Sequence, residues 1–183
     1  PEGIRTIAER IHSIAVFLEE SINRLGYKQV NVQYFDTLRF ALPDTISAQQ
    51  IRTIALSKEV NLRYFKNGDV GMSIDETTDI IAVNVLLSIF AIAAGRDWEK
   101  VSDVPMASSI SAEMKRQSTY LTHEVFNKYH TETEMMRYIK RLDRKDISLA
   151  HSMISLGSCT MKLNAAAEML PLSRPEFMNM HPL

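Results

Sequence analysis

The alternation of apolar and polar positions is clearest at the start of the chain. Between Glu2 and Leu25, isoleucine and leucine recur every three or four residues, and most charged side chains lie away from that stripe. This is the period of a surface helix that buries one face, and Gly26 stands where such a helix ends. We predict an amphipathic helix over residues 2–25 that packs across a sheet, with His12 on its polar face or at the boundary.

The next fifty positions predict a small sheet. Residues 28–33 and 37–42 alternate between apolar and polar side chains, as half-buried strands do. Residues 61–65 and 70–74 flank an Asn-Gly-Asp sequence that favours a hairpin, because Asn and Gly tolerate positive φ. Between these two pairs, Ser47 is a good N-cap for a short helix. The order of elements predicts an α+β fold, with helices packed on a small antiparallel sheet.

A further helix is predicted from Thr77 or Thr78 to about Ala94, and it is apolar on most sides. It is short for a bilayer span and is interrupted by polar residues such as Asn84, so we interpret it as a buried core helix. The preceding Asp75-Glu76 pair suits a helix start better than an acidic site.

Beyond Gly95 the pattern fades, and the serine-rich stretch 106–118 is typical of a linker. Thr131 then stands three residues before Glu134, which is the spacing of a reciprocal capping box. An apolar stripe at helical spacing follows, with basic residues near its end that complement the helix dipole. We expect a mainly helical arm over residues 131–183.

Composition narrows the class of protein without identifying it. Apolar residues make up 45% and charged residues 23% of the 183 positions, which is ordinary for a globular protein. The net charge of −1 gives no electrostatic case for binding nucleic acid or an anionic membrane. The single cysteine, Cys159, excludes an internal disulfide. The chain begins with Pro1 rather than Met, and we expect it to be an internal piece of a longer polypeptide.

The most distinctive stretch is GSCTMKLN, residues 157–164, which leads into an alanine-rich helical turn. A small, hydroxyl-bearing loop before a helix lets backbone and hydroxyl donors approach an anionic group closely. A tight turn that only joins the arm to its first helix is the structural alternative. Cys159 is either a redox-sensitive thiol, if it is exposed, or a small apolar residue, if it is buried.

Two long strings around this stretch carry a family resemblance. YHTETEMMRYIKRLDRKDISL and MISLGSCTMKLNAAAEMLPLSRPEF resemble the start of the second half of glycine decarboxylases, the P-proteins of the glycine cleavage system. Upstream, YFDTLRF and VGMSIDETT fit the end of the first half of the same enzymes less tightly. The resemblance implies that residues 1–104 are the small C-terminal domain of the non-catalytic first half. Residues 105–130 would be a linker, and residues 131–183 the truncated N-terminal arm of the catalytic second half.

The resemblance also implies a cofactor and a reaction. Glycine decarboxylases use pyridoxal phosphate, held on a lysine, as an electron sink when glycine loses its carboxylate. The aminomethyl group then passes to the lipoyl arm of the H-protein. That lysine lies in a histidine-lysine motif that this chain lacks, so we expect no catalytic residue here and no cofactor bound to the isolated chain. The small domain implied is that of the type I pyridoxal-phosphate fold.

Within the resemblance, residues 157–164 become the candidate site. We expect Ser158 and Thr160 to offer donors to the glycine carboxylate or to the cofactor, Lys162 to add positive charge, and Cys159 to lie beside them. The implied partners are glycine, lipoylated H-protein and a second copy of the fused chain, with no nucleic acid and no membrane. The implied location is the cytoplasm in a bacterium, or the mitochondrial matrix in a eukaryote.

Two other interpretations stay open at this point. The chain could be a non-catalytic association module whose apolar surfaces, rich in methionine, dock partner chains. It could also be the small domain of another type I pyridoxal-phosphate enzyme, such as an aminotransferase or a desulfurase, although the GSCTMKLN string argues against that.

Overall fold

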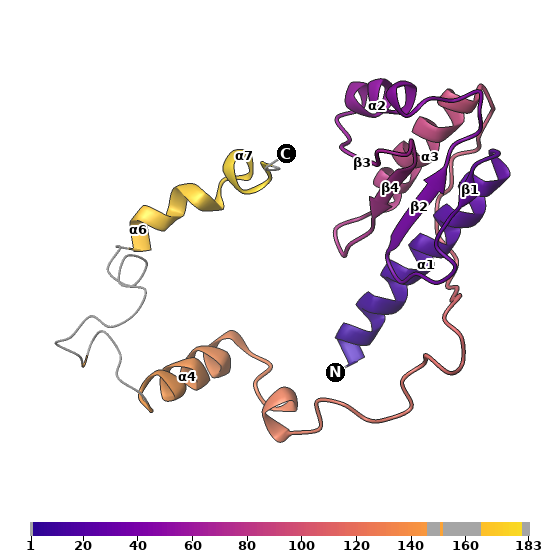
Figure 1. Ribbon diagram of the computed structural model, residues 1–183. Helices are drawn as coiled ribbons and strands as arrows, with labels where there is room; N and C mark the ends of the chain where they lie inside the picture. The colour runs from indigo at the N-terminus through magenta and orange to yellow at the C-terminus, as the bar shows by residue number, and fades with distance from the viewer. Residues whose placement is uncertain (1, 146–150, 152–165, 181–183) are drawn as a thin grey trace. The chain divides into compact units, whose positions relative to one another are not determined.

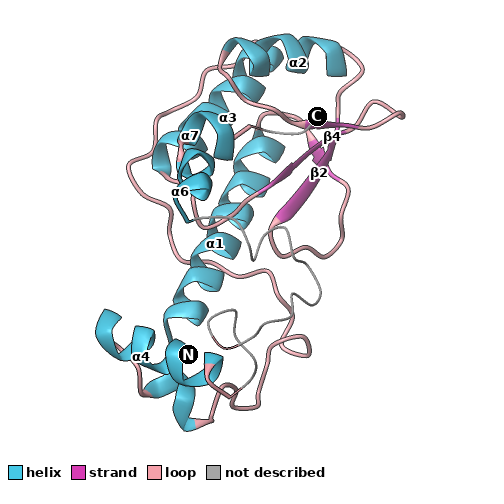
Figure 2. Cartoon of the chain, turned by 90° about the vertical axis from the view of Figure 1, so that its left-hand side faces the viewer, coloured by secondary structure: helices cyan, strands magenta, loops and turns pink. Residues whose placement is uncertain are grey.

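The computed structural model describes residues 2–145, 151 and 166–180, and it divides into two compact units at Thr122 and His123. The first unit, residues 1–122, holds the sheet and its helices (Figures 1 and 2). The second, residues 123–183, holds short helices and turns.

The first unit begins with the long helix α1, Glu2–Arg24, as the isoleucine and leucine spacing predicts. Its middle and end are buried, and Leu18 and Ile22 are fully covered. Its first two turns extend beyond the core, because Ile4 and Ile7 stay about half exposed. Gly26 has a φ of +100°, a left-handed conformation that suits glycine and turns the chain towards the sheet.

The sheet has four strands in the order β1-β2-β4-β3, and all neighbours are antiparallel. The strands are β1 (Lys28–Gln29), β2 (Thr37–Ala41), β3 (Arg63–Tyr64) and β4 (Val70–Ser73). Leu38 pairs with Met72 and Phe40 pairs with Val70, so their side chains share the face that meets the core. The predicted hairpin is confirmed, since β3 and β4 flank the Asn-Gly-Asp turn.

Two further helices complete the core. Helix α2, Ala48–Ser57, is capped by Ser47, whose side chain accepts a hydrogen bond from the Gln50 backbone N–H, as predicted. Helix α3, Ile80–Ala94, ends at Gly95 in the left-handed conformation. The α3 side chain of Phe90 lies against Phe40 and makes an edge contact with Tyr27, so it joins helix, sheet and the turn after α1. The predicted α+β fold, with helices on a small antiparallel sheet, is therefore confirmed.

The predicted strand over residues 28–33 is longer than the observed one. After Gln29 only the Val30 N–H continues the ladder, donating to the Arg39 carbonyl at 2.8 Å. Residues 31–36 instead turn back over α1, where Phe35 stacks on His12. The alternation of residues 28–33 therefore predicted a strand correctly only for Lys28–Gln29, where β2 provides the hydrogen-bonding partner.

The prediction that Thr77 or Thr78 caps α3 is wrong. Asp79 is the N-cap, and its carboxylate accepts a hydrogen bond from the Ala82 N–H at 2.8 Å. The hydroxyls of Thr77 and Thr78 are already used, because both donate to the carboxylate of Asp75. Three cap-forming residues in a row, two threonines and an aspartate, left the sequence ambiguous at this position.

In the second unit, the best-defined element is helix α4, Glu132–Asp143, which begins with the predicted capping box. Thr131 accepts from the Glu134 N–H at 3.2 Å, and the Glu134 carboxylate accepts from the Thr131 N–H at 3.2 Å. The other helices there are α6 (Ala166–Met169) and α7 (Pro175–Met178), with 3₁₀ turns at Glu124–Asn127 and Leu170–Ser173. Over residues 123–145, 151 and 167–180 of this unit, no residue is buried.

Candidate functional site

The candidate site predicted from sequence lies outside the described residues. Ser158, Cys159, Thr160 and Lys162 all fall within residues 152–165, so their predicted roles stay predictions.

The described residues do not fit pyridoxal phosphate. A lysine that holds this cofactor needs a sheltered pocket, because burial is what lowers the pKa of an amine enough to make it a nucleophile. The described lysines are exposed, apart from Lys58, which is half-buried just after α2. Lys128 and Lys140 pair with nearby carboxylates on their own surface turns. We therefore derive no chemical step through the cofactor from this part of the chain.

The most completely buried polar cluster is centred on His12 of α1. The imidazole is 2% exposed, so the prediction of a polar-face or boundary position is wrong. Its Nδ1 lies 2.8 Å from the Phe35 carbonyl oxygen, and its Nε2 lies 3.0 Å from the Ser109 backbone nitrogen. A carbonyl can only accept and a backbone N–H can only donate, so the ring carries its proton on Nδ1 and is neutral.

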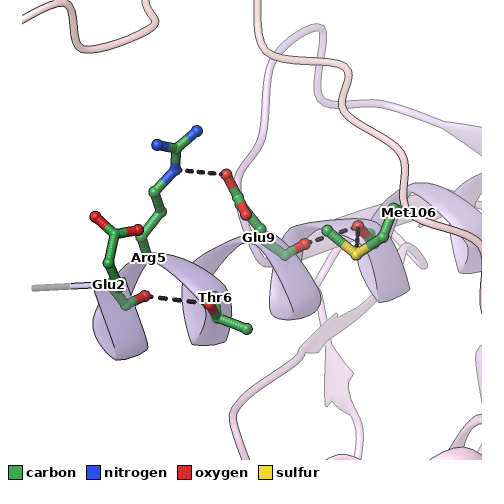
Figure 3. Close-up of polar contacts among 6 residues, drawn as sticks. Glu2, Arg5, Thr6, Glu9 and Met106 are labelled. Carbon is green, nitrogen blue, oxygen red and sulfur yellow. Dashed lines mark hydrogen bonds and ion pairs between the residues drawn. The ribbon is translucent and has the colours of Figure 1, made fainter.

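Ser13, the next residue, is also buried, and it too contacts the segment after residue 105. Its Oγ donates to the Glu9 carbonyl at 2.7 Å and lies 3.1 Å from both the backbone N–H and the carbonyl oxygen of Ala107. Met106 lies against the same stretch of α1 (Figure 3). Nearer the start of that helix, Arg5 pairs with Glu9, and the Thr6 hydroxyl donates to the Glu2 carbonyl. Residues 106–109, predicted as linker, are thus hydrogen-bonded along the helix.

The sequence prediction missed this cluster because histidine is polar, and His12 was therefore placed on the polar face of the helix or at its boundary. The available signal was position: residues 12 and 13 lie one turn from Glu9 and Val16, between Ile11 and Ile14 of the apolar stripe. A polar pair within a buried stripe requires partners from another segment. The sequence does not say which segment provides them.

A second group of charged side chains lies on the sheet face opposite the helices. Arg39 pairs with Asp69 through two guanidinium nitrogens, at 2.7 and 2.6 Å, and its guanidinium lies 4.3 Å from the centre of the Phe65 ring. That ring covers Gly71, where an added Cβ would meet Phe65 Cε2 at 2.9 Å. Each member is satisfied by its neighbours, which indicates a structural role.

The acidic residues before α3 also have local partners. Hydrogen bonds from Thr77 and Thr78, the Thr77 hydroxyl foremost, hold the pKa of the Asp75 carboxyl below its ordinary value. Arg10 of α1 binds the carbonyls of Glu76 and Thr78, at 3.4 and 2.9 Å, and fixes this loop to the first helix. The sequence interpretation of a helix-start loop therefore fits, with Asp75 closing the turn and Asp79 capping the helix.

In the second unit, aromatic and basic side chains gather at α4. Tyr129 stacks on Tyr138 with ring centres 4.4 Å apart, and the Arg141 guanidinium lies 5.2 Å from the Tyr138 ring and hydrogen-bonds the Tyr129 hydroxyl. His123 accepts from the Val125 N–H, and His130 donates to the Asn127 carbonyl. Both histidines thus serve turns of the backbone.

Among the residues that the structure describes, no group of three His, Cys, Asp or Glu residues could hold a metal ion. Within the same residues, no helix is both long and apolar enough to cross a bilayer.

Comparisons with known proteins extend beyond the described residues. The sequence model of the glycine cleavage system P-protein family matches residues 1–90. The whole chain aligns with glycine dehydrogenase (decarboxylating) of Bacteroides fragilis strain YCH46 at 81% identity over 182 residues. The proteins of the same name from Bacteroides thetaiotaomicron and Shewanella amazonensis are 78% and 49% identical over 182 and 186 residues. In each case the alignment covers 100% of this chain and 19% of the relative, so the chain spans about a fifth of their length.

Proposed function

We propose that the chain belongs to the glycine cleavage system P-protein family, as the resemblance of its sequence predicted, and that it forms part of a glycine dehydrogenase (decarboxylating). The observation that supports this is the 81% identity, which extends over the complete chain to a curated relative of that name. Because the chain spans 19% of that relative, the activity belongs to the whole protein.

The proposed reaction is the oxidative decarboxylation of glycine, with transfer of the aminomethyl group to the lipoyl arm of an H-protein. Pyridoxal phosphate would supply the electron sink for loss of the carboxylate. The described residues offer no sheltered lysine for it. We therefore assign the cofactor amine to another part of the whole protein, and a scaffolding role to the first unit.

The proposed role of residues 157–164 is to line the entrance to the active site. Ser158 and Thr160 would donate hydrogen bonds to the glycine carboxylate or to the cofactor, with Lys162 adding positive charge and Cys159 beside them. We keep the proposed boundaries of a small domain at 1–104, a linker at 105–130 and an arm from 131. The relatives named above are bacterial, which supports a cytoplasmic location, and a homodimer of fused chains remains part of the proposal.

The activity is tested by glycine–bicarbonate exchange with lipoylated H-protein and pyridoxal phosphate. The native full-length protein should exchange label, and the purified 183-residue chain should not, because it lacks the lysine that holds the cofactor. Exchange by the 183-residue chain would contradict the proposed division of labour. No exchange by the full-length protein would contradict the proposed activity.

The role of the loop is tested by Thr160→Ala in the full-length protein. Losing one hydrogen bond to a charged group should lower glycine turnover about tenfold or more. Thr45→Ala is the matched control, because Thr45 is exposed in the loop before α2. Unchanged turnover and lipoyl transfer in Thr160→Ala would leave only the tight-turn interpretation.

The association module keeps one supporting observation. Met135, Met136, Ile139 and Leu142 of α4 are all between 43% and 60% exposed, so a partner surface could cover this stripe. The aminotransferase or desulfurase alternative has no such support, because the relatives compared are glycine dehydrogenases at 46% identity or more.

A further inference from the structure

We propose that His12 is an acid-sensitive clasp that fastens residues 106–110 to helix α1. The proposal is independent of glycine decarboxylation. It concerns how a segment towards the end of the first unit is held, and it starts from the buried contacts of one imidazole.

The imidazole connects three separate parts of the chain. It belongs to α1, its Nδ1 donates to the Phe35 carbonyl, and its Nε2 accepts from the Ser109 N–H, 97 residues away in sequence. The ring also stacks on Phe35, with the two planes 3° apart and their centres 5.6 Å apart. Both polar atoms and one face of the ring are therefore engaged.

This arrangement requires the neutral ring. A second proton would go to Nε2, where it would point at the Ser109 N–H 3.0 Å away, and two donors would then face each other. The Ser109 hydroxyl, 3.4 Å from Nε2, would have to move closer to accept that proton. The Phe35 contact would survive, because Nδ1 donates in either state. Protonation therefore breaks one bond selectively, and that bond is one of the two points at which residues 106–110 are held to α1.

The surroundings offer the protonated ring little compensation. On α1, Glu9 is paired with Arg5, and Arg10 is bound to backbone carbonyls. From the 30–36 loop, Tyr34 lies with its ring centre 5.9 Å from that of His12, and Asp36 accepts from the Thr37 hydroxyl. The segment Met-Ala-Ser-Ser-Ile, residues 106–110, carries no charge. Ser109 also bonds the Tyr34 hydroxyl, whose pKa is raised by burial, so that phenol stays neutral.

A neighbouring contact provides an internal reference. Ser13 holds Ala107 by accepting a hydrogen bond from the Ala107 N–H, and a hydroxyl does not titrate in this range. The segment is thus fixed at two successive points, only one of which responds to acid. Histidine is the side chain that ordinarily changes charge between pH 5 and pH 8. Acid therefore favours the open segment, because only there is a protonated imidazole solvated, and opening lengthens the free segment beyond Ala107.

The test is amide hydrogen exchange of the native polypeptide that carries this chain, resolved to single residues by fragmentation in the mass spectrometer. Each rate is divided by the unstructured rate at the same pH, because exchange itself depends on pH. Between pH 8 and pH 5.5, the protection of the Ser109 amide should fall about tenfold, as expected for one buried hydrogen bond. The Val60 amide, which donates to Ala55 elsewhere in the unit, should keep its protection and so exclude global unfolding.

Two variants separate the clasp from a general acid effect. His12→Gln keeps an amide donor and acceptor but takes up no proton, so the protection of Ser109 should no longer depend on pH, whatever its level. Ser13→Ala should weaken the Ala107 amide at both pH values and leave the fall at Ser109 in place. Constant Ser109 protection in the unmodified protein would overturn the proposal, and so would an equal fall in His12→Gln.

Discussion

Helices α1 and α4 start from the same sequence signal and reach different surroundings. Both show apolar residues at helical spacing with charges on the other side, and both are confirmed as helices. Ile22 of α1 is fully buried against the sheet and α3, whereas Ile139 of α4 is 51% exposed. The spacing of apolar residues therefore predicts that a helix forms and which face it would bury, but not what covers that face.

The largest expected effect comes from the same substitution placed on each helix. Ile22→Ala should lower the free energy of unfolding of the first unit by about 2–5 kcal/mol, because it leaves a cavity in a fully packed core. Ile139→Ala should change stability by less than about 0.5 kcal/mol, as expected at an exposed position. Urea unfolding of the chain, followed by the fluorescence of its single tryptophan, Trp98, measures the first, because Trp98 packs against that core.

Helix α4 needs its own probe, because Trp98 lies in the other unit. Amide exchange across Glu132–Asp143 reports whether Ile139→Ala loosens that helix. A loss of several kcal/mol at Ile139 would show that α4 is covered in solution. The contrast between the two helices would then disappear.

A second pair of variants tests how closely the sheet is packed. In Gly71→Ala, the new Cβ would lie 2.9 Å from the Phe65 ring and 3.3 Å from the Leu38 carbonyl oxygen. The ring must shift away from Arg39, so we expect a loss of about 1–3 kcal/mol in urea unfolding. Gly3→Ala is the control, because an added Cβ meets nothing within 4 Å in the projecting part of α1. It should stabilise that helix by up to about 1 kcal/mol.

If Gly71→Ala were neutral, Phe65 would have an alternative position, and the stack of Arg39 over its ring would not be needed for the fold. A destabilising Gly3→Ala would show instead that the first turns of α1 are covered in solution.

The sequence predicted what local rules determine. The Asn-Gly-Asp hairpin, the Ser47 cap and the Thr131–Glu134 capping box are each fixed by the chemistry of a few adjacent residues, and all three are confirmed. Failures occurred where a distant segment decides the outcome. The strand from residue 28 stops early because residues 31–36 turn towards His12, and His12 is buried because Ser109 lies across it. The candidate loop at 157–164 stays a prediction, because it lies outside the described residues.

Helix caps should show the same contrast at a smaller scale. Ser47→Ala removes the side-chain bond to the Gln50 N–H and should cost about 1 kcal/mol of the stability of the first unit, since α2 packs on α3. Thr131→Ala removes the equivalent bond to the Glu134 N–H. Its cost, also about 1 kcal/mol, should appear only as faster amide exchange within α4, because no described residue there is buried.

These two variants are compared by urea unfolding with Trp98 fluorescence and by amide exchange in parallel. A change in the Trp98 transition in Thr131→Ala would show that the two units unfold together. That result would contradict the division of the chain into two units that unfold independently.

The smallest effect expected is a difference in acid sensitivity between two carboxylates at helix starts. Bonds from the Thr131 and His130 N–H groups, and from the Thr131 hydroxyl, lower the pKa of Glu134, and the Thr77 and Thr78 bonds lower that of Asp75. A folded-state pKa below the unfolded one means that each carboxylate stabilises its turn above the unfolded pKa and stops doing so as the pH falls through the folded one. For glutamate and aspartate that window lies below about pH 4.5.

Between pH 6 and about pH 3.5, α4 should lose amide protection, because no buried core supports its cap. Helix α3 should keep its protection over the same range, because Val83, Phe90 and their neighbours are buried. Glu134→Gln retains a capping-box side chain that does not titrate, and it should remove the acid response of α4 alone. If α4 frays equally in Glu134→Gln, the cap is not the acid-sensitive part of the second unit.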